Sequence, residues 1–317
     1  MKQIVTITFS PCIDRSATVA KMIPEKKLKC TSPKLEPGGG GINVARVINR
    51  FGGNCTAVFP VGGYTGRYLF TMLQQEKVPC HIIETQEETR ENVIVFEEQH
   101  QQQYRFGMPG VPLADHEWQR LLATLESMTD VDYIVASGSL PPGVPEDIYY
   151  RIAILANKTG AKLIVDTSGE PLKHALRASV FLIKPNLAEL SYIAGKPDLD
   201  VGEIPLVAKQ VLTEGNCQAI VVSLGKNGAM LVTKTAVKKI LSPLVQSVST
   251  VGAGDSMVAG MAFSLSQGES LETAVQFGIA CGTAATLTPG TGLCHPEEVI
   301  RLLRQMNEEK QFEDIRS

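Results

Sequence analysis

The sequence predicts an α/β protein in which helices cover both faces of a doubly wound, mostly parallel sheet, with a small β-sheet lid beside it. Three observations predict this class. Short apolar runs alternate with amphipathic stretches along most of the 317 residues, as in parallel sheets covered by helices. Polar residues directly follow several apolar runs, as they do at the ligand-binding edge of such sheets. Four short polar strand-like pieces stand apart from this alternation and predict the lid.

Composition excludes several classes of function. Hydrophobic residues make up 44% and charged residues 20% of the chain, which is ordinary for a globular protein. The net charge of -3 offers no basic field for nucleic acid or anionic lipid, so neither partner is expected. The apolar residues 4–9 are too few for a signal sequence or a membrane span. Seven scattered cysteines without a CxxC pair or Cys/His cluster predict neither a disulfide framework nor a zinc site, and they indicate a reduced cytoplasm.

The elements follow from the hydrophobic pattern in chain order. Strands are expected at residues 4–8, 55–61, 133–136, 163–165, 181–183 and 220–223. Helices are expected after the glycines at 38–41 and at residues 66–75, 118–128, 147–157, 207–213, 257–265 and 271–285. No linker divides residues 1–317, so a single α/β domain is expected.

The lid is expected in two segments, at about 15–36 and 90–107. Its strands are predicted at residues 16–19, 27–31, 92–97 and 103–106. A thin sheet with one apolar face does not remain exposed. We therefore expect a homodimer that forms through the lid.

Several polar residues follow the expected strands, and they would share one edge of the sheet. Asp14 comes soon after the first strand and could accept hydrogen bonds from sugar hydroxyls, although turn aspartates are common. The others lie after the third to sixth expected strands: Ser139, Asp166, Lys184, Asn186, Ser223 and Gly225.

The stretch at 249–256 is the strongest candidate for chemistry. Gly252, Ala253 and Gly254 precede an apolar run that reads as a buried helix, and unpaired amides at a helix start can cradle an anion. Asp255 follows at once, and it would suit a base that takes a proton from an attacking hydroxyl while a phosphoryl group is transferred. The alternative is an ordinary helix-start aspartate, and this stretch alone does not separate the two.

A second glycine cluster occupies residues 38–41 and is followed by Asn43. Four consecutive glycines are hard to explain by structure alone, and they would let a ligand lie directly on the backbone at Gly39 and Gly40. Asn43 could then bond to hydroxyl groups. The alternative, a flexible linker, is disfavoured because a helix pattern begins at once.

Charged groups near these turns suit a bound triphosphate. Asn186 and Glu189 stand at i and i+3, an arrangement that suits Mg²⁺, although the same pair is typical of a helix capping box. Lys184 would add charge near the phosphates. The lid residues Lys27, Arg90 and Arg105 could hold a phosphate together, whereas each alone would be a solvated surface charge.

These residues together resemble the PfkB/ribokinase family of sugar kinases. The first family signature is similar to residues 38–45, the second to residues 249–256, and the Asn-x-x-Glu metal motif to Asn186 and Glu189. The likeness extends from the first strand to near Pro296 and implies a ribokinase-like fold. Within the family, residues 37–41, 89–90 and 137–143 are most similar to the minor type of bacterial 6-phosphofructokinase.

The resemblance implies ATP-dependent phosphorylation of fructose 6-phosphate to fructose 1,6-bisphosphate. Asp255 would be the general base, and Gly252, Ala253 and Gly254 would form the anion hole. The residues that would bind the sugar phosphate are Asp14, Gly39, Gly40, Asn43, Arg90, Arg105 and Ser139. Those that would line the ATP site are Lys27, Lys184, Asn186, Ser223, Gly225, Ser247, Ile279 and Thr283.

The resemblance also implies two cations. Mg²⁺ would bind at Asn186 and Glu189, and K⁺ would lie near Ser249, Val251, Ala285, Thr288, Gly290 and Gly292. Thr288 and Gly292 differ from the asparagine and arginine of that loop in relatives, and Ile23 replaces a polar lid residue.

Other activities stay open. A tagatose-6-phosphate kinase or a 1-phosphofructokinase would use the same chemistry, although these enzymes usually have lysine where Gly40 stands. A catalytically inactive sugar-phosphate sensor is a further alternative. A dinucleotide-dependent oxidoreductase is the most distant, because the first glycine cluster lies about 30 residues beyond the first strand, outside the position that the dinucleotide fingerprint requires.

Overall fold

The main sheet is built from short, apolar, mostly β-branched strands. The computed structural model describes residues 2–288 and 290–316, with side chains described as far as residue 308. Within these residues the sheet has nine strands in the order β13-β12-β11-β10-β9-β8-β1-β4-β5. The parallel strands are β1 (Gln3–Ile7), β4 (Cys55–Gly62), β5 (Cys80–Thr85), β8 (Val131–Ser137), β9 (Lys162–Asp166), β10 (Val180–Ile183) and β11 (Cys217–Ser223). The antiparallel hairpin of β12 (Ala229–Thr233) and β13 (Val237–Ile240) extends one end.

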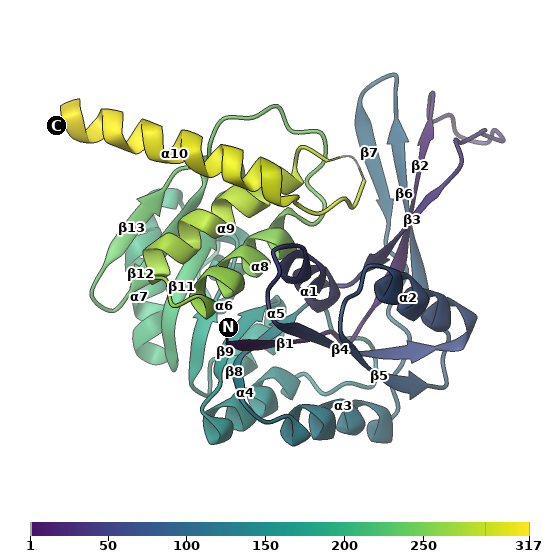
Figure 1. Cartoon of the computed structure of the whole chain (residues 1–317), viewed down its shortest axis with the longest axis horizontal. Coiled ribbons are helices and arrows are strands. Elements are labelled where there is room, and N and C mark those ends of the chain that lie inside the picture. Colours follow the sequence, from purple (N-terminus) through teal and green to yellow (C-terminus); the bar gives the residue numbers. More distant parts are fainter. Residues whose placement is uncertain (1, 289, 317) are drawn as a thin grey trace.

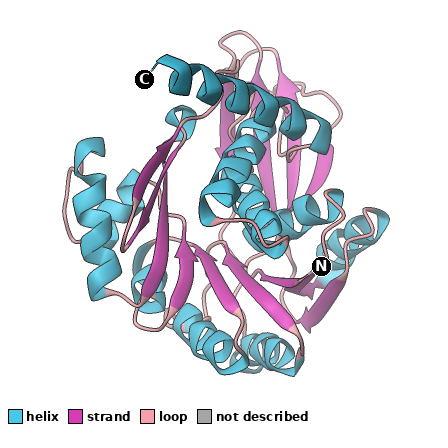
Figure 2. Cartoon of the chain, turned by 60° about the vertical axis from the view of Figure 1, so that its left-hand side comes forward, coloured by secondary structure: helices cyan, strands magenta, loops and turns pink. Residues whose placement is uncertain are grey.

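Alternate strand residues point to opposite faces and build two separate cores, because successive side chains of a strand face opposite ways. Ile4 and Tyr133 belong to one core, and Val5 and Ile134 to the other. The first core is covered by α1 (Gly40–Arg50), α2 (Gly63–Gln75), α8 (Ala253–Ser266), α9 (Leu271–Ala285) and α10 (Pro296–Arg316). The second is covered by α3 (Asp115–Ser127), α4 (Ile148–Thr159), α5 (Gly169–Ala175), α6 (Leu187–Ile193) and α7 (Ile204–Glu214). Figures 1 and 2 show the two helical layers on either side of the strands.

A smaller sheet of four strands stands beside the main one. Its order is β3-β2-β6-β7, formed by β2 (Cys12–Val19), β3 (Lys34–Gly38), β6 (Arg90–Glu97) and β7 (Gln102–Phe106). Figure 1 shows this lid sheet projecting away from the main sheet on the side of α2. Strand β2 follows β1 almost directly, so the lid is continuous with the edge where β1 ends.

The expected strand at residues 27–31 is wrong. There the chain makes only an isolated bridge between Val19 and Cys30, and Glu25 takes a left-handed φ of 58° in the turn before it. Residues 34–38 form β3 instead, although Pro37 argues against a strand. Because β3 is an edge strand, Pro37 does not interrupt a ladder on both sides.

The expected fold class is confirmed. Beyond the expected elements, the described residues form β5, β12, β13, α5 and α10, and α6 continues past the single turn expected at residues 186–189. None of the described helices combines the length and the hydrophobicity needed to cross a bilayer.

Candidate active site

Polar side chains from adjacent strands meet at the carboxyl edge of the main sheet. Ser137 ends β8, Asp166 ends β9, Lys184 follows β10 and Ser223 ends β11, and these strands are neighbours in the sheet. Lys184 is buried, and its Nζ lies 3.1 Å from Asp166 Oδ1. Burial disfavours the ammonium, but the attraction and hydrogen bond of Asp166, together with the charges of Glu189 and Asp255, outweigh this effect and raise the pKa of Lys184. Lys184 is therefore a fixed positive charge at this edge.

The start of α8 lies beside this charge. Gly252 takes a left-handed φ of 73° and precedes the first helical residue, Ala253. The first amides of a helix have no acceptor within it, and the helix dipole adds partial positive charge there. A β-carbon added to Gly254 would lie 3.5 Å from Lys184 Nζ. The helix start and the ammonium thus face the same space, which favours an anion.

Asp255 lies in the first turn of α8 and contacts Asn43 of α1. Asn43 Nδ2 donates to Asp255 Oδ2 at 2.8 Å. Burial raises the pKa of Asp255 to about 6, against the lowering effect of this hydrogen bond. The carboxyl is ionised at neutral pH and basic enough to take a proton. Asn43 Oδ1 is buried and has no partner among the described residues, so an acceptor beside Asp255 is left for a donor from a ligand.

A cleft of about 340 Å³ opens at Asp255, between the lid and the main sheet. Its lining includes seven residues proposed for the sugar phosphate together with the proposed base: Asp14, Gly39, Gly40, Asn43, Arg90, Arg105, Ser139 and Asp255. Arg105 Nη2 donates to Thr250 Oγ1 at 3.1 Å, which ties β7 to the stretch before α8. Arg90 Nη1 donates to the carbonyl of Met108 at 2.6 Å. The residues gathered from five distant segments form one concave site.

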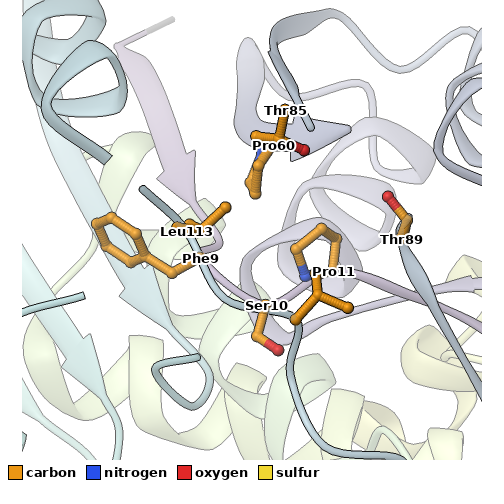
Figure 3. A pocket seen from close by; sticks show the side chains of 8 residues that line it. Phe9, Ser10, Pro11, Pro60, Thr85, Thr89 and Leu113 are labelled. Carbon is orange, nitrogen blue, oxygen red and sulfur yellow. The ribbon is translucent and has the colours of Figure 1, made fainter. Parts of the chain in front are cut away.

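A second cavity nearby is far smaller. It has a volume of about 10 Å³ and lies where Phe9, Ser10 and Pro11 meet Pro60 and residues of two later segments. Figure 3 shows these side chains around it. A space of this size holds about one water molecule, so it is no sugar site.

A third hollow lies beside Asn186, in the region proposed for the nucleotide. It has a volume of about 550 Å³ and is lined in part by Asn186, Ser223, Leu224, Asn227 and Lys239. Of these, Asn186 and Ser223 were expected from the sequence, and an isolated parallel bridge joins them.

Asn186 and Glu189 form a complete capping box at the start of α6. The Glu189 amide donates to Asn186 Oδ1, and the Asn186 amide donates to Glu189 Oε2, both at 2.9 Å. The capping alternative therefore describes these bonds. The capping box uses only Oε2 of the Glu189 carboxylate. Oε1 can still accept a hydrogen bond from a water molecule of a hydrated cation. The pair consequently fits Mg²⁺ that keeps most of its waters.

The segments proposed to hold K⁺ pack against each other. The amides of Val248 and Ser249 donate to the carbonyl of Thr286 at 2.8 and 3.1 Å, and Ser249 Oγ donates to the carbonyl of Gly290 at 2.9 Å. Glu36 of the lid is buried beside this loop, with Oε2 accepting from Thr291 Oγ1 at 2.8 Å. Carbonyl oxygens are the ligands that a monovalent cation would use here, but the Thr286 and Gly290 carbonyls already accept these bonds, and Lys34 Nζ lies 2.9 Å from Glu36 Oε1. The same segments contain the other proposed positions, Val251, Ala285, Thr288 and Gly292.

The tetraglycine stretch has a steric explanation that the sequence analysis did not foresee. A β-carbon on Gly38 would lie 2.7 Å from Asp14 Oδ2, and one on Gly40 would lie 2.8 Å from the carbonyl carbon of Ser137. A β-carbon on Gly41 would lie 2.6 Å from the carbonyl oxygen of Ile7. Structure alone therefore explains glycine at these three positions, contrary to expectation, because the turn packs onto β1, β2 and β8.

Some proposed nucleotide residues lie apart from these clefts. Lys27 is exposed in the loop between β2 and β3, and Gly225 begins the short 3₁₀ turn Gly225–Asn227. On α9, Ile279 is buried, and Thr283 Oγ1 lies 2.7 Å from Ser242 Oγ. Ser247 Oγ donates to the carbonyl of Ser249 at 3.4 Å.

Sequence reasoning missed Asn92, which lines the cleft and donates to Asp14 Oδ1 at 2.9 Å. The available signal was a polar residue directly before the apolar run at 93–96. The parallel pairing of β2 and β6 places it opposite Asp14.

Comparison with known proteins identifies the family to which this chain belongs. The model of the pfkB family of carbohydrate kinases matches residues 1–298. The chain belongs to this family. It is 41% identical over 303 residues to the ATP-dependent 6-phosphofructokinase isozyme 2 of Escherichia coli (strain K12), covering 95% of this chain and 98% of the relative.

Solved structures agree. This kinase superposes with a TM-score of 0.92 and 41% identity on phosphofructokinase-2 of Escherichia coli in complex with potassium, covering 97% of this chain and 100% of that one. A ribokinase of Thermotoga maritima, at 22% identity and a TM-score of 0.78, covers 96% of this chain and all of the other, and it shows the shared fold. The expected ribokinase-like sheet is thereby confirmed.

Proposed function

We propose that this kinase transfers the γ-phosphoryl group of ATP to O1 of fructose 6-phosphate. The observation that carries the proposal is the meeting of Asp255, the start of α8 and Lys184 beside a cleft lined by two lid arginines. The 41% identity to an enzyme named ATP-dependent 6-phosphofructokinase supports the same substrate.

The reaction uses Asp255 as the general base. Its carboxylate takes the proton of the 1-hydroxyl as the sugar oxygen bonds to the γ-phosphorus. The bond from that phosphorus to the β–γ bridging oxygen breaks, and ADP leaves with the electron pair. The amides from Gly252 to Gly254 stabilise the charge on the transferring group, as donors do in an oxyanion hole.

The sugar phosphate is held from both ends. Asp14 and Asn43 accept hydrogen bonds from the sugar hydroxyl groups, and the buried Oδ1 of Asn43, which has no partner among the described residues, is one of these acceptors. Arg90, Arg105 and Ser139 bind the 6-phosphate, with backbone contacts at Gly39 and Gly40. Guanidinium groups suit phosphate because they offer paired donors in a fixed plane.

The nucleotide lies over the neighbouring region. Lys184, Asn186, Ser223, Gly225, Ser247, Ile279 and Thr283 line its site, and Lys27 reaches its phosphates from the lid. Asn186 and Glu189 would hold Mg²⁺, which would supply positive charge to the phosphates, and the loop after α9 would hold K⁺. The relative crystallised with potassium supports the second assignment.

We also propose that two copies pair through the lid sheet. The support is the projection of the sheet from the main body and the exposure of Phe106, at 45%, on its last strand. The enzyme would function in a reducing cytoplasm, as the scattered cysteines suggest. Sedimentation of the purified protein tests the pairing, and a monomer at micromolar concentration would contradict it.

Turnover of sugar phosphates tests the reaction. Purified protein with MgATP should release ADP with fructose 6-phosphate, and kcat/KM should exceed the values for tagatose 6-phosphate and fructose 1-phosphate. A higher value for either competitor would reassign the substrate. Binding of fructose 6-phosphate without any ADP release would indicate the inactive sensor instead. Repeating the assay with Na⁺ in place of K⁺ tests the monovalent cation.

A further inference from the structure

Asn92 bridges the two ends of the proposed sugar-phosphate site. It lies on β6 directly opposite Asp14 of β2 in the parallel ladder. Its Nδ2 donates to Asp14 Oδ1 at 2.9 Å, and its Oδ1 accepts from the Met108 amide at 3.1 Å and from Arg90 Nη1 at 3.3 Å. One side chain therefore contacts both the carboxylate and the guanidinium.

The partners determine which way the amide of Asn92 points. A carboxylate such as Asp14 only accepts hydrogen bonds, whereas the Arg90 guanidinium and the Met108 amide only donate. The NH₂ end must face Asp14 and the oxygen must face Arg90. Nδ2 also lies 3.2 Å from Cys12 Sγ. A side chain of this size needs a donor facing Asp14 and an acceptor facing Arg90. Asparagine provides both, whereas aspartate lacks the donor and alanine lacks both groups.

We infer that Asn92 is a positioning residue that holds Asp14 and Arg90 as one recognition unit for the sugar phosphate. The inference rests on the proposed function, which gives hydroxyl binding to Asp14 and phosphate binding to Arg90. Asn92 sets the spacing between these groups, and thus the length of substrate that satisfies both.

The remaining contacts leave both groups able to bind a ligand. Gly38 is packed so closely on Asp14 Oδ2 that a β-carbon there would lie 2.7 Å from it, which keeps that oxygen in place while Oδ1 is held by Asn92. Arg90 Nη2 donates to the carbonyl of Ser10 at 3.3 Å, and its buried Nε has no partner among the described residues. A buried guanidinium nitrogen without an acceptor suits an incoming phosphate oxygen.

The lid does not depend on this side chain for its fold. The β2–β6 ladder pairs eight successive residues from Cys12 to Val19, and backbone pairing is independent of the amide of Asn92. The side chain is itself partly exposed in the cleft. Its loss should therefore change substrate affinity much more than stability.

The first test compares wild type with Asn92→Ala in calorimetric binding of fructose 6-phosphate and in steady-state turnover. We expect Kd and KM for the sugar phosphate to rise roughly tenfold to a hundredfold, as for loss of a hydrogen bond to a charged group. The KM for ATP and kcat should change less than about twofold. The matched control is Asn157→Ala on α4, which removes one hydrogen bond, from Asn157 Nδ2 to the carbonyl of Ser179. This control should leave the Kd and KM for the sugar phosphate unchanged.

The outcomes separate the inference from the proposed function. Wild type that binds fructose 6-phosphate without turning it over would refute the proposed reaction, while the binding comparison would still test Asn92. Equal Kd in wild type and Asn92→Ala would overturn the inference even if turnover is normal. Wild type that does not bind the sugar phosphate would overturn both.

A second variant and a double-mutant cycle exclude a merely structural role. Asn92→Asp keeps the shape and the oxygen facing Arg90, but it places a carboxylate against Asp14, so affinity should fall at least as far as in Asn92→Ala. If Asn92 acts through Arg90, Asn92→Ala should weaken phosphate-dependent binding far less in an Arg90→Ala background. Additive effects, or a loss in kcat alone, would refute the positioning role.

Discussion

The two glycine-rich turns of this kinase are alike in sequence and opposite in structure. At residues 38–41 the missing side chains make room for side-chain and backbone atoms of the protein itself, since β-carbons on Gly38, Gly40 and Gly41 would lie 2.4–2.7 Å from the nearest atoms of Asp14, Ser137 and Ile7. At the start of α8, a β-carbon on Gly252 would lie 2.8 Å from Leu293 Cδ2, but one on Gly254 would meet only Lys184 Nζ, at an ordinary 3.5 Å. The first turn is packed at each of these three glycines, whereas the second is open at Gly254.

The difference indicates that glycine has two separate uses in one site. The packed turn brings α1 close to the ends of the strands and so aims Asn43 into the cleft. The open turn presents the amides of a helix start and a lysine to an anion, although the Ala253 amide also donates to the carbonyl of Thr250 at 3.5 Å. The hydrogen bond from Asn43 to Asp255 joins the helices that begin at the two turns.

The largest expected effect tests whether the open turn carries the chemistry. Asp255→Asn should lower kcat by about 10²–10⁴-fold, the usual contribution of a general base, with little change in sugar-phosphate Kd. Single-turnover kinetics and calorimetry measure the two quantities. Unchanged turnover would reduce Asp255 to a helix-start residue.

The same substitution should stabilise the fold at neutral pH. Burial raises the pKa of Asp255 from an ordinary 3.8 to about 6, so between these values the native state holds a proton that the unfolded state has lost. Stability therefore falls as pH rises through this window, and above pH 6 the buried charge is a cost that asparagine removes. Thermal unfolding at pH 8 should show a higher Tm for Asp255→Asn than for wild type.

Substitution in the packed turn should reduce stability instead. Gly40→Ala places a β-carbon 2.8 Å from the carbonyl carbon of Ser137, and overpacking of this kind costs about 1–3 kcal/mol. Urea unfolding measures the loss. Gly202→Ala is the control, because a β-carbon there meets nothing within 4 Å and its φ needs no glycine. Equal stability of the two variants would contradict the packed description.

The contrast between the turns could not be predicted from the sequence, whereas the sheet could. Alternation of apolar and amphipathic segments identified the parallel strands other than β5 and placed Asp166, Lys184 and Ser223 at neighbouring strand ends, because it depends on local periodicity. Which atoms surround Gly40 depends on how β1 and β8 meet α1, and those segments are far apart in the chain. Asn92 was missed for the same reason, because its partner Asp14 is 78 residues away.

Prediction of the lid strands from the sequence was limited for a different reason. The strand at 27–31 was expected from local residue types, but the register of β2 with residues 34–38 prevails. The position of Pro37 on an edge strand is a property of the sheet order, and no local pattern reports it.

The pH dependence of turnover probes the bond that joins the two turns. Because the base must be ionised, kcat/KM should fall about tenfold per pH unit below about pH 6 and level off above it. The Asn43 hydrogen bond lowers the pKa of Asp255, so Asn43→Ala should move this acidic limb to higher pH. A pH profile of each enzyme measures the shift. An unmoved limb would show that the titrating group is not Asp255.

The smallest expected effect is also the most specific to the open turn. Gly254→Ala should raise stability by up to about 1 kcal/mol, since alanine is the better helix former and its methyl group meets no backbone. The same methyl group projects toward Lys184 Nζ, into the space proposed for the transferring phosphoryl group, so kcat should fall although the fold is more stable. Urea unfolding and initial rates on one preparation decide this. A variant that gains stability at full turnover would show that no anion uses this space, and the two turns would then differ in packing alone.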